Sequence, residues 1–225
     1  MGIVVALDGP AGAGKSSTAK EVARQLHFLY IDTGAMYRAV TLAALRAGIS
    51  ISDTAAVVEI ARHSEIRFER RNAELHTFLN GEDVSAAIRS VEVAQWVSPV
   101  SAIAEVREQM VAAQREMGID NDIVMEGRDI GTHVFPQAQF KFYLNADVRI
   151  RARRRIHDYQ RIGQSLSEDE IVAELRKRDR IDSSRQHSPL RQAEGAIVVD
   201  TTDLRFEEQV GIIVNHVRSG LQENR

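Results

Sequence analysis

Residues 3–26, IVVALDGPAGAGKSSTAKEVARQL, place a glycine-rich loop between two segments of different character. Residues 3–7 form a short Val-rich run without polar alternation, which predicts a strand buried on both faces. After the loop, apolar residues recur at helical spacing, which predicts an amphipathic helix. They are Ala19, Val22, Ala23 and Leu26. The stretch therefore predicts a strand, a loop and a helix in sequence.

The loop itself, GPAGAGKS at residues 9–16, matches the pattern GxxxxGK[ST] in full. Its glycines allow a tight turn that points backbone N–H groups at an anion, and the following helix adds its positive dipole end. In such a loop Lys15 would reach the outer phosphates, and the Ser16 hydroxyl would help to hold Mg²⁺. The alternative is a glycine turn that only joins strand to helix. Ser17 would either add a phosphate contact or cap the helix.

Composition limits the class of protein. With 225 residues, of which 44% are hydrophobic, the chain can form one domain with elaborations or two small ones. Its 29 Lys and Arg against 32 Asp and Glu give a net charge of -3, so we expect no nucleic-acid partner. It has no cysteine, which excludes disulfides and fits the cytoplasm. No apolar run approaches the roughly 20 residues that a membrane helix needs, so we expect no membrane partner.

Three further apolar runs, at residues 122–126, 140–144 and 196–200, also predict buried strands. Helical stretches lie between the predicted strands. One of them has an apolar face formed by Val106, Met110 and Ala113. Strands that alternate with helices predict an α/β fold, in which helices cover a parallel sheet.

Residues 65–79 break this pattern, because their two-residue alternation predicts an antiparallel hairpin around a polar turn at residues 71–73. The next segment, NGEDVSAAIRS, predicts a turn and a short helix. We interpret residues 60–98 as an insertion beside the parallel core.

Arginines are concentrated in two predicted helices of a chain that is slightly acidic overall. The first carries Arg149, Arg151, Arg153, Arg154, Arg155 and Arg161. At helical spacing Arg151, Arg154 and Arg155 share a face, while Arg153 points elsewhere. In the second helix, the shared face holds Arg178, Asp182 and Arg185. Guanidinium groups suit the charge on a transferring phosphoryl group; the alternative is a solvated face of ion pairs such as Glu174 with Arg178.

Two polar segments follow predicted strands, where ligands bind in open parallel sheets. The first holds Asp32, Thr33 and Arg38, and the second holds Glu126, Gly127, Arg128 and Asp129. The alternatives are a helix cap and a surface arginine for the first segment, and a structural salt bridge for the second. No apolar strand ends in a clear Mg²⁺-binding aspartate, unless Asp129 or Asp200 serves. A guanine-reading Asn-Lys-x-Asp signature is also absent, which disfavours a GTPase switch.

Taken together, these motifs resemble those of the bacterial cytidylate kinases, which phosphorylate CMP and dCMP. The resemblance runs in order along almost the whole chain. It rests on DGPAGAGKSS, YIDTGAMYRA, GEDVSAAIRS, VSPVSAIAEVRE, EGRDIGTHVFP, RARRR, KRDRIDSSR, SPL and DTTDL. It implies a P-loop NTPase-type parallel sheet flanked by helices, with a hairpin-containing insertion that binds the monophosphate and a helical lid.

The resemblance also implies how the chain is divided. Residues 1–225 would form a single kinase domain that consists of three parts. The core would comprise residues 1–36, 99–145 and 164–225. The monophosphate-binding region would comprise residues 37–98, and the lid residues 146–163. We expect a cytoplasmic monomer.

Residue by residue, the resemblance implies a donor end and an acceptor end. The ATP phosphates would be bound by Gly9, Pro10, Ala11, Gly12, Ala13, Gly14, Lys15, Ser16 and Ser17, with Mg²⁺ at Ser16. The CMP phosphate would be held by Arg38 and Arg128. The cytosine would be read by Thr33, Arg107, Asp129 and Arg185, and the sugar held by Ser98, Arg178 and Asp182. The catalytic residues would be Lys15, Arg128, Arg151, Arg154 and Arg155.

The implied reaction is in-line transfer of the γ-phosphoryl group of ATP to CMP or dCMP, in a site closed by the lid. Catalysis would come from positioning and charge neutralisation. Asp129 suits the exocyclic amine of cytosine, and arginines suit its carbonyl and ring nitrogen. Two alternatives stay open: a P-loop kinase for another small acceptor, and an arginine-rich nucleic-acid-binding ATPase.

Overall fold

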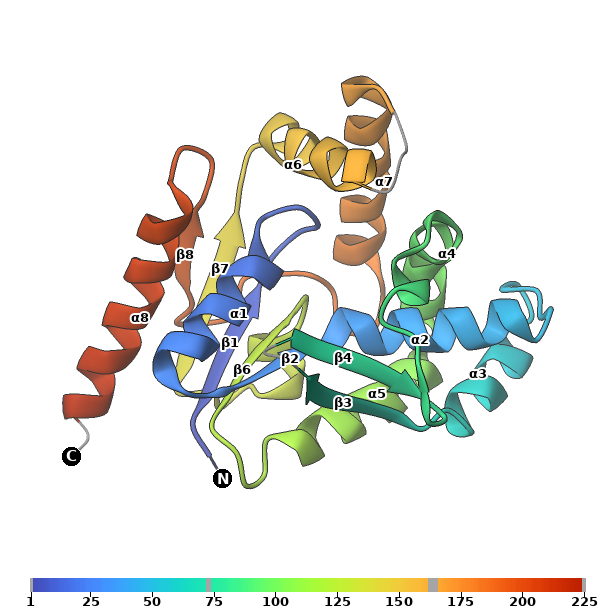
Figure 1. Cartoon of the computed structure of the whole chain (residues 1–225), viewed down its shortest axis with the longest axis horizontal. Helices are drawn as coiled ribbons and strands as arrows, with labels where there is room; N and C mark the ends of the chain where they lie inside the picture. The colour runs from blue at the N-terminus through green and yellow to red at the C-terminus, as the bar shows by residue number, and fades with distance from the viewer. Residues whose placement is uncertain (1, 72–73, 162–165, 224–225) are drawn as a thin grey trace. The chain divides into compact units, whose positions relative to one another are not determined.

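The computed structural model describes residues 2–71, 74–161 and 166–223 (Figure 1). The chain divides into two compact units, Met1–Tyr30 with Gly118–Arg225, and Ile31–Met117. The first unit contains the phosphate loop and the second contains the predicted hairpin. The assignment of residues 37–98 to monophosphate binding, of residues 146–163 to the lid, and of the rest to the core stays a prediction.

A five-stranded sheet forms the centre of the first unit, in the order β2-β6-β1-β7-β8. These strands are β1 (Val4–Asp8), β2 (Leu29–Asp32), β6 (Ile123–Gly127), β7 (Phe140–Asn145) and β8 (Ile197–Asp200). The pairs β1–β6, β1–β7 and β7–β8 are parallel. Every residue of β1 and β6 is buried. The four Val- and Ile-rich strands and the parallel α/β fold predicted from the sequence are thus confirmed.

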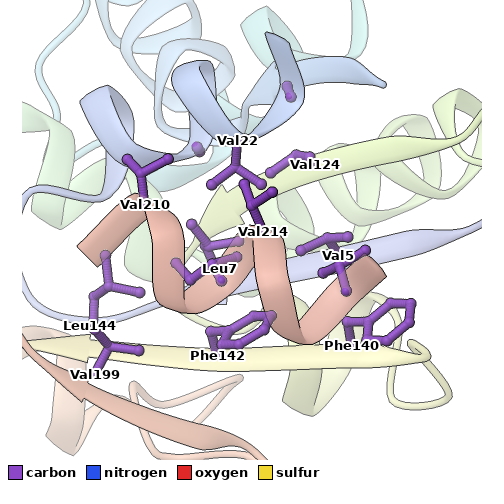
Figure 2. Packing of buried hydrophobic residues seen from close by; sticks show 14 of the residues in the cluster. Val5, Leu7, Val22, Val124, Phe140, Phe142, Leu144, Val199, Val210 and Val214 are labelled. Atoms are coloured by element: carbon purple, nitrogen blue, oxygen red, sulfur yellow. The ribbon is translucent and has the colours of Figure 1, made fainter. Parts of the chain in front are cut away.

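One face of this sheet is covered by α1 (Lys15–Leu26) and α8 (Phe206–Glu223). Figure 2 shows Val210 and Val214 of α8 lying over Leu7 and Phe142, with Val22 of α1 beside them. All five side chains are almost completely buried. Burying one such side chain contributes roughly 1.5–3 kcal/mol. The predicted apolar face of the first helix is therefore confirmed, with its last member, Leu26, packed at the edge of the cluster.

The remaining helices of the first unit are formed by residues in the second half of the sequence. They are the one-turn π-helix η2 (Ile130–Val134), α6 (Val148–Arg161) and α7 (Glu168–Ser184). Helices α6 and α7 pack against each other through an apolar cluster that includes Ala152 and Leu175. Ser167 begins α7 with a capping box, in which its hydroxyl accepts from Glu170 N–H and the Glu170 carboxylate accepts from Ser167 N–H.

Register places four loops at one edge of the sheet. Asp8 of β1 is opposite Gly127 of β6, and Asn145 of β7 is opposite Asp200 of β8. The loops that follow these strands therefore meet at their carboxyl ends, where open parallel sheets bind ligands. Gly9 is needed here, because its φ is 150° and a Cβ atom would lie 2.0 Å from the Leu144 carbonyl oxygen.

The second unit combines helices with a small antiparallel sheet, β3-β4-β5. Its elements are α2 (Thr33–Arg46), α3 (Thr54–Arg62), β3 (Ile66–Arg71), β4 (Glu74–Leu79), β5 (Glu82–Asp83), η1 (Ala87–Arg89), α4 (Val91–Ala102) and α5 (Ala104–Met117). Strands β3 and β4 pair from Ile66 with Leu79 to Arg71 with Glu74, so the predicted hairpin is confirmed. Residues 72 and 73 of its turn lie outside the described residues. The predicted short helix is the 3-10 turn η1, and β5 is an additional strand that the alternation did not indicate.

The predicted apolar face of α5 is buried at Val106 and Met110 and partly buried at Ala113, within a cluster that includes Tyr37 and Val57. None of the helices in the described part of the chain is long and apolar enough to cross a membrane.

Candidate functional site

Lys15 is the buried cation of the phosphate loop. Its Nζ donates a hydrogen bond to the Pro10 carbonyl at 2.7 Å, so the side chain folds back over the loop. Burial, with the nearby Arg128 guanidinium as the next largest cause, lowers the pKa of Lys15 to about 7, whereas Glu126 opposes the shift. A nearby anion strongly stabilises the charged form of an amine with so low a pKa. The sequence motif predicts such an anion, a phosphate, at this position.

Glu126, at the end of β6, contacts the loop and was given no role by the sequence motifs. Its carboxylate accepts from the Ser16 hydroxyl at 3.0 Å and from the Tyr30 hydroxyl at 2.5 Å. A buried carboxylate beside the Ser16 hydroxyl offers the oxygen ligands that Mg²⁺ prefers. Asp200 has a different setting, because its exposed carboxylate accepts from the backbone N–H and the hydroxyl of Thr202.

Ser17 and Thr18 both bond to the residue that precedes α1. Their hydroxyls donate to the Gly14 carbonyl at 3.0 and 2.8 Å. Gly14 is the N-cap and provides no side-chain cap. Ser17 therefore does not cap α1 as an N-cap residue does, and its predicted phosphate contact stays a prediction. Thr18 also accepts from the Gln209 amide at 2.7 Å, which ties α8 to the loop helix.

Arg151 and Arg154 of α6 both lie against the phosphate loop. Arg151 donates to the Ala11 carbonyl at 3.1 Å, to the Ala146 carbonyl at 3.0 Å and to Asp179 at 2.8 Å. Its guanidinium is therefore bonded on all three nitrogens, and the side chain is buried. These bonds give Arg151 a structural role here, beside its predicted role in catalysis.

Arg154 reaches the loop through Thr201, which follows β8. It donates to the Thr201 hydroxyl at 3.0 Å and to the Thr201 carbonyl at 2.6 Å. The same hydroxyl donates to the Ala13 carbonyl at 3.2 Å. A chain of hydrogen bonds thus connects α6, the end of β8 and the phosphate loop.

The other arginines of α6 are arranged differently. Arg155 lies over the Tyr159 ring, with its guanidinium carbon 5.1 Å from the ring centre. Arg149 and Arg153 are exposed and contact Glu168, each at 3.3 Å. The prediction that Arg153 points away from Arg151 and Arg154 is confirmed. The ion pairs with Glu168 match the alternative of a solvated charged face for these two residues, whereas the side chain of Arg161 lies outside the described residues.

Arg128 and Asp182 form a buried ion pair at the end of β6. Arg128 Nε donates to Asp182 Oδ2 at 2.8 Å, with the side chains 18% and 5% exposed. Burial raises the pKa of Asp182, but Arg128 and Arg178 outweigh burial and hold this pKa below its ordinary value. Asp182 in turn raises the pKa of Arg128 against the effect of burial.

Asp129 and Arg185 lie next to this pair. Arg185 Nη2 is 3.8 Å from Asp129 Oδ1, and both side chains are nearly inaccessible. Arg185 also donates from Nε to the Ser188 carbonyl at 2.6 Å. The structure thus brings together five of the predicted residues of the first unit: Lys15, Arg128, Asp129, Asp182 and Arg185. Arg178 belongs with them, because its charge acts on both Lys15 and Asp182.

In the second unit, Asp32 and Arg38 form a pair at the start of α2. Asp32 caps the helix by accepting from Ala35 N–H at 3.0 Å, and it accepts from Arg38 Nη2 at 2.7 Å. The capping alternative for Asp32 is therefore confirmed. Arg38 is only 23% exposed, so it is not a plain surface residue. Burial raises the pKa of Asp32, but Arg38 and the cap bond hold it below its ordinary value. Thr33, the first residue of α2, is buried beside them.

Ser98 and Arg107 meet through Ser101, also in the second unit. The Ser101 hydroxyl donates to the Ser98 carbonyl at 3.0 Å, and Arg107 Nη1 donates to the Ser101 carbonyl at 3.1 Å. The Arg107 guanidinium carbon lies 5.2 Å from the centre of the Tyr37 ring. Ser98 and Arg107 are both buried. A buried arginine stacked on an aromatic ring is held in one orientation, as a base-reading side chain must be.

Comparison with known proteins identifies relatives over the whole chain. Residues 5–219 match the family described as cytidylate kinase. A cytidylate kinase of Caldanaerobacter subterraneus subsp. tengcongensis is 50% identical over 216 residues, which are 96% of this chain and 95% of that protein. The cytidylate kinase of Shouchella clausii is 48% identical over 96% of each chain. That of Geobacter sp. (strain M21) is 44% identical over 99% of this chain and 95% of its own.

Among solved structures, an uncharacterised protein from Eubacterium ventriosum has a similar fold. It is 11% identical, with a TM-score of 0.54, and the match covers 96% of this chain and 99% of that one. At this identity the likeness concerns the fold alone.

The buried pair of Arg128 and Asp182 predicts a specific stability profile. In Asp182→Asn the guanidinium loses its charged partner, so the free energy of unfolding at pH 7 should fall by roughly 3 kcal/mol. The folded pKa of Asp182 lies below the unfolded value of about 3.9. Its contribution is therefore complete above that value and is lost as the pH falls through the folded pKa. Urea unfolding at pH 7, 5 and 3 measures the difference, which should shrink at pH 3.

The matched control is Glu82→Gln, which removes the charge of an exposed carboxylate that bonds to Arg46. An exposed pair contributes little, so this variant should unfold nearly as the wild type does. If Asp182→Asn were as stable as Glu82→Gln at pH 7, the buried pair would contribute no more to stability than an exposed pair does.

Proposed function

The chain belongs to the cytidylate kinase family, and from this premise we propose that it transfers the γ-phosphoryl group of ATP to CMP or dCMP. The products are ADP and CDP or dCDP. The observation that carries the proposal is the burial of Lys15 in the phosphate loop, where desolvation and the nearby Arg128 guanidinium both lower the pKa of the lysine. A buried lysine whose charge is disfavoured in this way is stabilised when phosphates bind beside it.

At the donor end, Lys15 and the backbone of residues 9–17 bind the ATP phosphates. Lys15 must exchange its bond to the Pro10 carbonyl for a phosphate oxygen. Ser16 and Glu126 are the residues that would hold Mg²⁺, because their oxygens lie 3.0 Å apart beside the loop. When bound, Mg²⁺ neutralises charge on the phosphates and fixes their geometry.

At the acceptor end, we propose roles for residues of each unit taken by itself. In the first unit, Arg128 binds the CMP phosphate, Asp129 and Arg185 read the cytosine, and Arg178 and Asp182 hold the sugar. In the second unit, Arg38 binds the phosphate, Thr33 and Arg107 read the base, and Ser98 holds the sugar. The support for these roles is the family resemblance, together with the ion pair that holds Arg128 and the ring contact that holds Arg107. Five of the side chains are also buried, namely Thr33, Ser98, Arg107, Asp129 and Asp182.

The transfer itself needs no covalent intermediate. A phosphate oxygen of CMP attacks the γ-phosphorus in line, and the bond from that phosphorus to the bridging oxygen of ADP breaks. Lys15 and Arg128 hold the charge that spreads over the transferring oxygens. Arg154 can join them if it leaves Thr201 as the lid closes and excludes water. Arg151 and Arg155 keep their predicted catalytic roles as part of this proposal. We also expect the protein to be a monomer and to be cytoplasmic.

A substrate panel tests the proposal. Mg-ATP is supplied with CMP, dCMP, UMP, AMP, GMP or shikimate, and ADP release is followed. CMP and dCMP should give the highest kcat/KM. UMP presents a carbonyl where cytosine has its amine, so it should react roughly tenfold or more slowly. Lys15→Ala is the control for background turnover. If CMP and dCMP release no more ADP than a mixture without acceptor, the proposed activity is wrong.

The pKa of Lys15 predicts that ATP binding takes up a proton. Without ligand this pKa is about 7, so at pH 8 most of the lysine is neutral. The triphosphate raises the pKa, and most of one proton should be bound with each ATP. Calorimetric titration at pH 8 in two buffers of different ionisation enthalpy measures this uptake. The matched control is Lys15→Arg, whose guanidinium is already charged and should take up none. Equal uptake by both proteins would assign the proton to another group.

A further inference from the structure

Asp8, the last residue of β1, has no part in the roles assigned above. Its carboxylate is buried and accepts two backbone hydrogen bonds, from Ile130 N–H to Oδ1 and from Gly131 N–H to Oδ2, each at 2.8 Å. These N–H groups belong to the first two residues of η2. A helical turn leaves such groups without partners inside the turn, so Asp8 satisfies two donors that are buried at the sheet edge.

The Asp8 side chain, from the neighbouring strand β1, caps η2 in place of the residue that precedes this turn. The residue before η2 is Asp129, and aspartate is a favoured cap. The Asp129 side chain nevertheless makes no cap bond, and its Oδ1 lies 3.8 Å from Arg185 Nη2. Asp8 can replace it because the parallel register sets Asp8 opposite Gly127, just before Arg128 and Asp129.

We propose that Asp8 is a positioning residue for the acceptor end of the site. By bonding to the backbone of Ile130 and Gly131, it fixes the Arg128–Asp129 segment and leaves the Asp129 carboxylate directed at Arg185. The inference rests on the proposed function, since Arg128 and Asp129 are the residues that would bind the phosphate and the cytosine of CMP.

The charge of Asp8 fits a positioning role better than a stabilising one. Burial raises the pKa of Asp8 to about 6, while the bonds from Gly131 and Ile130 oppose the shift. The charged groups that contribute to this value are Asp129, which raises the pKa, and Lys15, which lowers it. A folded pKa above the unfolded value means that ionising Asp8 lowers the stability of the fold at neutral pH. Its bonds to Ile130 and Gly131 are therefore kept at a cost in stability.

The test is Asp8→Asn, which keeps the shape of the side chain but replaces one acceptor oxygen with an amide that cannot accept from an N–H. The KM for CMP should rise about tenfold or more, and the preference for CMP over UMP should fall, while the KM for ATP changes by less than about threefold. The matched control is Asp200→Asn, an exposed carboxylate at the end of β8 that also accepts a backbone N–H and should leave all three values unchanged. Equal increases in both KM values, or unchanged CMP kinetics, would overturn the proposal.

A second measurement uses the wild-type protein, in case Asp8→Asn does not fold. The amide proton signals of Ile130 and Gly131 should titrate together, with a midpoint at a pH of about 6. The affinity for cytidine, which carries no titrating phosphate, should weaken as the pH falls through the same range. Amide signals without this titration, or a cytidine affinity that does not follow it, would contradict the role of Asp8. These readouts need no turnover, so a failure of the proposed kinase activity is seen separately in the substrate panel.

Discussion

The bond between Arg128 and Asp182 is the interaction on which the acceptor end of the first unit depends. It joins the loop after β6 to the last turn of α7 with a distance of 2.8 Å and little exposure to solvent. A buried ion pair need not stabilise a fold relative to apolar residues, but it fixes geometry because breaking it leaves a charge unpaired. Here the fixed charge is the cation that acts on Lys15.

This pair belongs to a larger set of charges that constrain one another. Lys15, Arg128 and Arg178 are cations that act on the same region, and Glu126 and Asp182 oppose them. Such a cluster costs stability without a ligand and gains it when anions bind, which is how phosphoryl-transfer sites are organised in advance of the reaction. The low pKa of Lys15, caused by burial and by Arg128, is a sign of this compromise.

Much of the fold could be predicted from the sequence, because periodicity and loop motifs are local. The buried strands, the helix after the phosphate loop and the hairpin of β3 and β4 all follow from patterns within a few residues. The strand β5 did not, because two residues are too few to show alternation.

The contacts that build the site were harder to predict, because they join residues far apart in the chain. Ser16 bonds to Glu126, Asp8 to Ile130, and Arg154 to Thr201. A helical face could indicate that Arg151 and Arg154 point the same way, but not that the Ala11 carbonyl would receive a bond from Arg151. The strand register, which no single segment encodes, sets the ends of these strands side by side and so helps to bring these pairs together.

The central claim, that Arg128 is held in place to bind the phosphate of CMP, is tested most directly by comparing two ligands. Calorimetric titration gives the affinities for CMP and for cytidine, which lacks the phosphate, in the wild type, in Arg128→Ala and in Arg153→Ala, an exposed arginine that pairs with Glu168. The account predicts that Arg128→Ala weakens CMP by about tenfold more than it weakens cytidine, and so removes most of the advantage of the phosphate. Arg153→Ala should behave as the wild type. An equal loss for CMP and cytidine in Arg128→Ala would contradict the claim.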